Sequence, residues 1–237
     1  MALLSRLRMP ASPLVWGVLV ASCMPMLAGC QAGVMIGRVL FGDPMISPAL
    51  TQVTRIKLED QTHTVHLACV APASVLHQYD ALQMDVVEQV ARQLRRRDVP
   101  VTSPDKVAMI VDDLGGLSDP RELAAEFDEG LLVFVNIEQF SLSDSGDSHL
   151  HRGRIAGEVI AYEIRPDIDP DDPTAHDENN RTEPVEVFRQ EVRVVYPETH
   201  PIPLDQMSAP MFKRKFLTRL SDEIGRKLYR FRVTDTI

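Results

Sequence analysis

An acidic segment near the middle of the chain has the residue spacing of a calcium-binding loop. Positions one, three, five and twelve of that template are filled by Asp167, Asp169, Asp171 and Glu178. Clustered carboxylate oxygens suit a hard cation such as calcium. Position six, where the turn needs glycine, is Asp172, and Pro170 and Pro173 restrict the backbone around it. The four acids are therefore a weak calcium candidate, and residues 166–184 are expected to form a solvated, acidic, proline-rich loop.

The tetrapeptide from Gly146 to His149 resembles the Gly-Asp-Ser block of a serine hydrolase family, in which the serine is the nucleophile. In that family the block follows the first strand, and an Asp-x-x-His pair lies near the C-terminus. Here the block falls in mid-chain, and the pair Asp60 and His63 precedes it. Glycine, aspartate and serine are common in turns, and a turn is enough to explain their presence here. A lipid-tethered hydrolase that uses Ser148 is kept as one alternative function, and a calcium-dependent interaction module that uses the acidic segment is kept as the other.

A second serine pattern, Ser103-x-x-Lys106, matches one element of the penicillin-recognising enzymes. The Ser-Asp-Asn and Lys-Thr-Gly elements that these enzymes also need are missing from the sequence. We therefore expect Ser103 to cap a helix that begins at Pro104.

The histidines show no spacing typical of a metal site. His63 and His66 are three residues apart, and His149 and His151 are two apart, without a cysteine or carboxylate fixed beside them. We expect surface histidines rather than zinc ligands. The sequence indicates no catalytic residue, no metal and no other cofactor, apart from lipid chains on a cysteine.

That cysteine is Cys30. The first eight residues contain two bases, Arg6 and Arg8, and no acid. An apolar run follows from Leu14 to Ala21, and it is too short to span a bilayer. The run leads to Leu27-Ala28-Gly29-Cys30, which resembles the lipobox of bacterial lipoproteins. The resemblance implies that residues 1–29 are a signal peptide and that the Cys30 thiol takes a diacylglycerol group as a thioether. The amine freed by cleavage then takes a further fatty acyl chain, such as palmitate.

The resemblance to lipoproteins also implies a location. Several acyl chains anchor a protein stably in a membrane. In bacterial lipoproteins the residue after the lipidated cysteine directs sorting. By this resemblance Gln31, which is not aspartate, favours the outer membrane, with the protein facing the periplasm. Cys23 is discarded with the signal peptide, so Cys69 is left alone, and its apolar neighbours predict a buried strand position.

Charge is distributed unevenly. The whole chain has a formal charge of −9, and loss of Arg6 and Arg8 with residues 1–29 changes it from −9 to −11. An acidic chain of this kind is a poor nucleic-acid binder. Residues 211–232 are the exception because eight basic residues face two acids there. If this stretch is a helix, its basic face could contact an envelope protein, an acidic polymer or anionic headgroups.

Hydrophobic periodicity predicts the structural elements that follow. Residues 30–60 contain several glycines and prolines and are expected to be a tether. Beyond it, residues 61–232 are expected to form one domain. The predicted strands are His63–Val70, Val99–Val101, Leu131–Ile137, Arg154–Ile164 and Val185–Tyr196. The predicted helices are Ser74–Arg97, Ser103–Gly115, Asp119–Phe127 and a C-terminal one with the stripe Phe212, Phe216, Leu220, Ile224 and Leu228.

This order predicts an α/β fold, a mixed sheet of about five strands with helices packed on it and an amphipathic C-terminal helix. Together with the lipobox, the order of elements over residues 60–230 resembles curli-secretion lipoproteins and penicillin-binding-protein-activator lipoproteins. Phe41-Gly42-Asp43-Pro44 and Phe140-Ser141-Leu142 resemble uncharacterised envelope lipoproteins. The resemblance implies no catalytic residues. This chain lacks an obvious pore-forming hairpin pair, which argues against the secretion-channel activity of the curli relatives. It implies a non-enzymatic, membrane-anchored binding or assembly module.

Overall fold

The structure is a computed structural model that describes residues 45–117, 119–144, 146–147, 149–165 and 184–232. The chain divides into two compact units, of which the larger is Ser47–Phe231. The smaller unit combines Met1–Ile46 with Arg232–Ile237. Its described residues lie in the short strands β1 (Met45–Ile46) and β7 (Phe231–Arg232).

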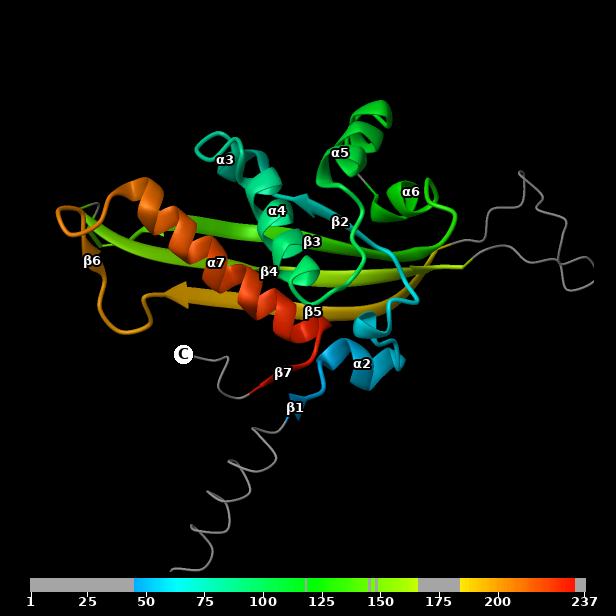
Figure 1. The fold of residues 1–237 in the computed structure, drawn as a ribbon. Coiled ribbons are helices and arrows are strands. Elements are labelled where there is room, and N and C mark those ends of the chain that lie inside the picture. Colours follow the sequence, from blue (N-terminus) through cyan, green and yellow to red (C-terminus); the bar gives the residue numbers. More distant parts are fainter. Residues whose placement is uncertain (1–44, 118, 145, 148, 166–183, 233–237) are drawn as a thin grey trace, which may run out of the picture. The chain divides into compact units, whose positions relative to one another are not determined.

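The larger unit is built on one mixed sheet. Its strands are β2 (Val65–Val70), β3 (Gly130–Ser143), β4 (Leu150–Ile164), β5 (Val185–Tyr196) and β6 (Ile202–Pro203). The order in the sheet is β2-β3-β4-β5, and β6 pairs with β4. Only the β2–β3 pair is parallel, and the pairs of β4 with β3, β5 and β6 are antiparallel. The predicted mixed sheet of five strands with packed helices is confirmed (Figure 1).

Both faces of this sheet are covered because its central strand is apolar on both sides. Along β3, Leu131, Val133 and Val135 belong to one cluster of buried side chains, whereas Leu132 and Phe134 belong to another. The helices α4 (Leu82–Arg95) and α7 (Ala209–Leu228) pack on the first side, and α5 (Pro104–Asp113) and α6 (Pro120–Ala124) pack on the second. This alternation is the two-residue period of a strand.

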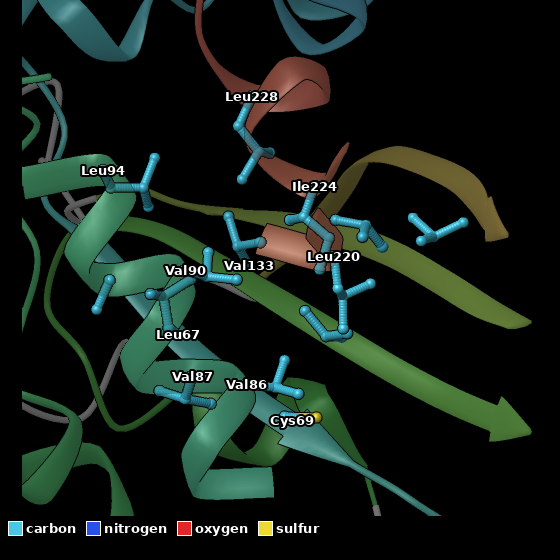
Figure 2. Close-up of a cluster of buried hydrophobic side chains, with 14 of the residues drawn as sticks. Leu67, Cys69, Val86, Val87, Val90, Leu94, Val133, Leu220, Ile224 and Leu228 are labelled. Atoms are coloured by element: carbon cyan, nitrogen blue, oxygen red, sulfur yellow. The ribbon is translucent and has the colours of Figure 1, made fainter. Parts of the chain in front are cut away.

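The predicted stripe of the C-terminal helix is confirmed as the buried side of α7. Phe212, Phe216, Leu220, Ile224 and Leu228 are all buried. Figure 2 shows Leu220, Ile224 and Leu228 directed towards the same cluster as side chains of α4 and β2. The sheet and α4 together cover this stripe, as its length and spacing require.

The helix expected over Ser74–Arg97 is divided in two. A short helix, α3 (Ala73–Leu76), is followed by a break before α4. In the break, the Asp80 carboxylate accepts the backbone N–H of Ala81 at 2.8 Å, which gives that N–H a partner outside the helical pattern. Ser74 lies inside α3 and does not cap it, because the N-cap residue is Pro72.

Part of the expected tether is folded. Residues from Ser47 belong to the larger unit and include α2 (Ala49–Thr54) and the 3₁₀ helix η1 (Leu58–Asp60). Leu50 and Leu58 have no exposed surface, so they are part of the core that α7 and the sheet form. Pro48, the only proline among the described residues of the expected tether, is the N-cap residue of α2 and begins a helix.

Candidate functional site

The outer edge of β2 is only partly covered. Near its start, the Val65 N–H donates to the Pro100 carbonyl at 2.9 Å, and the Thr102 N–H donates to the Val65 carbonyl at 3.0 Å. The expected strand at Val99–Val101 is thus a single bridge, Val65 with Val101. At Ser103 the chain turns away into α5. No other described residue pairs with this edge of β2.

Strand geometry places unpaired backbone groups along the rest of the edge. Alternate residues of a strand direct their N–H and C=O to the same side. Because Val65 directs its groups away from β3, Leu67 and Cys69 do the same. Their N–H and C=O therefore face the side of β2 that the 99–102 segment has left uncovered. Edges of this kind are ready to pair with another strand.

A groove of about 480 Å³ runs along this uncovered edge. Its floor is Leu67–Ala71, and its walls are α4 on one side and α5 on the other. Apolar side chains of α4 and α5 line the walls, namely Met84, Val87, Val107, Ala108 and Val111. In Figure 1, α4 and α5 lie near β2, the outer strand of the sheet. The volume and the apolar lining are typical of ligand sites.

The charged side chains that line the groove are all acidic. Asp80, before α4, and Asp112, at the end of α5, are the charged residues among those that line it. The other polar side chain in the lining is Gln83. The groove therefore combines an apolar wall, a free strand edge and negative charge.

Cys69 contributes backbone to this groove but no reactive thiol. Its side chain is buried between β2 and α4, as predicted (Figure 2). Burial raises the pKa of the Cys69 thiol far above its usual value, so the thiolate form is not populated at neutral pH. Nucleophilic chemistry at Cys69 is therefore disfavoured.

The expectation that the histidines are on the surface is wrong for His66 and His151. His66 is 5% exposed, its Nε2 lies 3.1 Å from the Glu129 carbonyl, and Thr102 contacts its Nδ1. His151 is equally buried, with Nε2 2.9 Å from the Met207 carbonyl, and it stacks on Phe212. Each imidazole is a structural group that satisfies a loop carbonyl, because a buried histidine needs such a partner.

Of the two serine candidates, the structure describes only Ser103. Ser103 occupies the N-cap position of α5, but its side chain makes no capping hydrogen bond, and Pro104 begins the helix. Ser148 lies outside the described residues. Beside it, the Asp147 carboxylate accepts the backbone N–H of His149 at 2.7 Å, which is a turn interaction.

The remaining candidates lie outside the described residues. These are Cys30, Asp167, Asp169, Asp171 and Glu178. Within the described ranges no group of three histidine, cysteine or acidic side chains is placed to hold a metal ion. The same ranges contain no helix long and apolar enough to cross a membrane.

The basic face of α7 is partly neutralised within the fold. Lys213 pairs with Asp85 of α4 at 2.6 Å, Arg219 pairs with Glu198 at 3.3 Å, and Arg226 pairs with Glu223 at 3.7 Å. Arg214 and Lys215 are exposed. The acidic partners come from α4, the β5–β6 connection and α7 itself.

Sequence reasoning missed the groove. The signal was present in the short extended segment at Val99–Val101, which is immediately followed by a helix start at Pro104. A segment of that length is too short to cover the whole edge of a six-residue strand such as β2. Nothing in the sequence, however, said which strand would be at the edge of the sheet.

No family model matches the chain, and no curated protein matches it. Among solved structures, a hypothetical protein from Chlamydia trachomatis has 13% identity and a TM-score of 0.32, over 68% of this chain and 97% of that one. A neuraminyllactose-binding hemagglutinin homolog from Helicobacter pylori has 12% identity and a TM-score of 0.30, over 76% of this chain and 88% of that one. Similarities this weak do not assign a function.

Proposed function

We propose that the chain is a non-enzymatic, membrane-anchored lipoprotein of the cell envelope that binds another envelope component. Lipid chains on Cys30 hold it to the membrane, most simply the outer membrane on its periplasmic side. The groove beside β2 is the binding site. The function is therefore to hold a partner near the membrane, as an assembly or binding module does.

The open edge of β2 is the observation that carries this proposal. A natural sheet edge is normally blunted or covered, because unpaired backbone groups invite association. Here the covering segment leaves the edge after Val65, and α4 and α5 leave an apolar groove where it would have continued. Such a groove suits binding of a partner, and burial raises the pKa of the Cys69 thiol, which disfavours nucleophilic chemistry there.

The anchor is tested by following the full chain in bacterial cells fed an alkyne-tagged fatty acid. Wild type should carry the tag and sediment with membranes. Cys30→Ala should lose the tag and appear in the soluble fraction, whereas Cys69→Ala should behave like wild type, because Cys69 is buried in the fold. A tagged Cys30→Ala protein would show that the anchor is wrong.

The binding role is tested with the same protein solubilised from membranes in detergent. Ala108 lines the groove, and its neighbour Met109 is 67% exposed and does not line it. Ala108→Trp should fill the groove and reduce the recovery of co-purifying envelope proteins. Met109→Trp should leave that recovery unchanged. Equal recovery from both variants would place the binding site elsewhere.

A further inference from the structure

We infer that the groove binds an extended peptide segment of a partner protein, which adds to the free edge of β2 as a further strand and carries at least one basic side chain. This inference rests on the proposed function in using the groove as its binding site. It goes further by giving the chemistry of the occupant and the atoms that recognise it.

The backbone of β2 supplies the first argument. Leu67 and Cys69 direct N–H and C=O to the uncovered edge, as the hydrogen bonds of Val65 establish. Buried backbone groups nearly always have partners in a native protein. An extended peptide offers an alternating row of N–H and C=O groups that matches this edge, which a compact ligand does not. This is the recognition mode of strand addition.

The chain itself already uses this mode at one position. Val101 lies beside Val65 in parallel orientation, with hydrogen bonds on both sides of Val65. The chain leaves the edge at Ser103, and the groove begins where it leaves, since Pro104 is part of the lining. A peptide in the groove would extend the line of the 99–102 segment towards Ala71.

The walls define what side chains the peptide carries. Successive side chains of a strand point to opposite sides, so one set would face α4 and the other α5. On α4 the contacts are Met84 and Val87, and on α5 they are Val107, Ala108 and Val111. Both sets would therefore be apolar and of small or medium size. Met84 can adapt to different partners because its side chain is flexible.

Charge complementarity supplies the basic residue. Asp80 and Asp112 are acidic and line the groove, and no basic side chain does so among the described residues. A lysine or arginine at an end of the apolar stretch would pair with one of them. An acidic peptide would be repelled by both.

The experiment is the selection of peptides from a phage-displayed library of random nine-residue sequences. The target is the full chain in detergent micelles, and the full-length Ala108→Trp variant serves for counter-selection. We expect enriched sequences with apolar residues at alternate positions and a lysine or arginine. Failure to enrich any sequence over the Ala108→Trp target, or enrichment of acidic sequences, would overturn the inference.

The best-enriched peptide is then synthesised with a fluorescent label and titrated by anisotropy. Asp112→Lys should weaken binding about tenfold or more, because it reverses a charge that lines the groove. Asp113→Lys is the matched control, since Asp113 is the next residue, is exposed and does not line the groove. It should change binding less than twofold. Equal effects of the two substitutions would overturn the charge argument.

Amide hydrogen exchange tests strand addition itself. Bound peptide should slow exchange of the Leu67 and Cys69 amides and leave that of Ala68, which is directed towards β3, unchanged. Alternate backbone nitrogens of the peptide form two sets, of which only one donates hydrogen bonds to β2. N-methylation of that set should abolish binding, and N-methylation of the other set should not. Binding without protection at Leu67 and Cys69 would overturn strand addition. The anchor is judged separately, since this experiment does not depend on Cys30.

Discussion

The imidazole of His66 stacks on the ring of Phe127, with centroids 3.7 Å apart and an interplanar angle of 18°. The Glu129 carbonyl, 3.1 Å from Nε2, can only accept a hydrogen bond, so Nε2 carries the proton. The Thr102 hydroxyl then donates to Nδ1 at 2.8 Å. Burial and, to a lesser degree, the charge of Lys106 lower the pKa of His66, although the Glu129 carbonyl opposes this. The folded chain therefore favours the neutral form of His66.

This arrangement predicts destabilisation by mild acid. Because the pKa of His66 is lower in the folded chain than the usual 6.5, its contribution to stability is complete above that pH. It is lost as the pH falls from 6.5 towards the folded pKa. His66→Gln should reduce the slope of the unfolding free energy against pH in this range, measured by urea denaturation. His149→Gln, at an exposed position, should keep the wild-type slope. An unchanged slope in His66→Gln would contradict this prediction.

Leu50 tests whether the segment before β2 is part of the fold. Leu50 is fully buried, whereas Val53 of the same helix is 69% exposed. Leu50→Ala should lower the free energy of unfolding by about 2–5 kcal/mol, because it removes buried methyl groups and leaves a cavity. Val53→Ala should change it by less than about 0.5 kcal/mol. Urea denaturation measures the free energy of unfolding of both variants. Equal small effects would mean that residues 47–60 act as a tether.

Gly157 tests the close approach of β3 and β4. A Cβ at this position would meet the backbone carbonyl of Asn136 and lie 3.1 Å from the Cα of Ile137. Backbone cannot move aside as a side-chain end can, so Gly157→Ala should cost roughly 1–3 kcal/mol of stability. Gly146→Ala is the control, because nothing lies within 4 Å of its added Cβ. Thermal denaturation that finds the two variants equally stable would show that these strands are further apart.

The sequence predicted the sheet and its helices well, because these elements are specified by local patterns. The stripe from Phe212 to Leu228 has the period of one helix face, and the apolar residues on both sides of β3 predict the helices that cover both faces of the sheet. The break before α4 was not predictable from periodicity, because the apolar spacing continues through Asp80 while a local hydrogen bond interrupts the helix.

The site was less predictable, because it depends on contacts that are distant in sequence. We predicted that His66 is on the surface. In the fold, Thr102 and Glu129, which are distant in sequence, contact its two ring nitrogens. The groove depends on β2 being at the edge of the sheet and on where α5 leaves it. The only indication in the sequence was the short extended segment Val99–Val101 followed by a helix start at Pro104, and it does not say which strand is at the edge.

The most direct test of a membrane-anchored binding module is photo-crosslinking in the bacterial envelope. A photoreactive benzoylphenylalanine replaces Ala108 in the groove or, as a control, the exposed Met109. We expect a discrete crosslinked product from position 108, none from position 109, and loss of that product when Cys30→Ala is added. No product from position 108, equal products from both positions, or a product that Cys30→Ala leaves unchanged would contradict the proposed function.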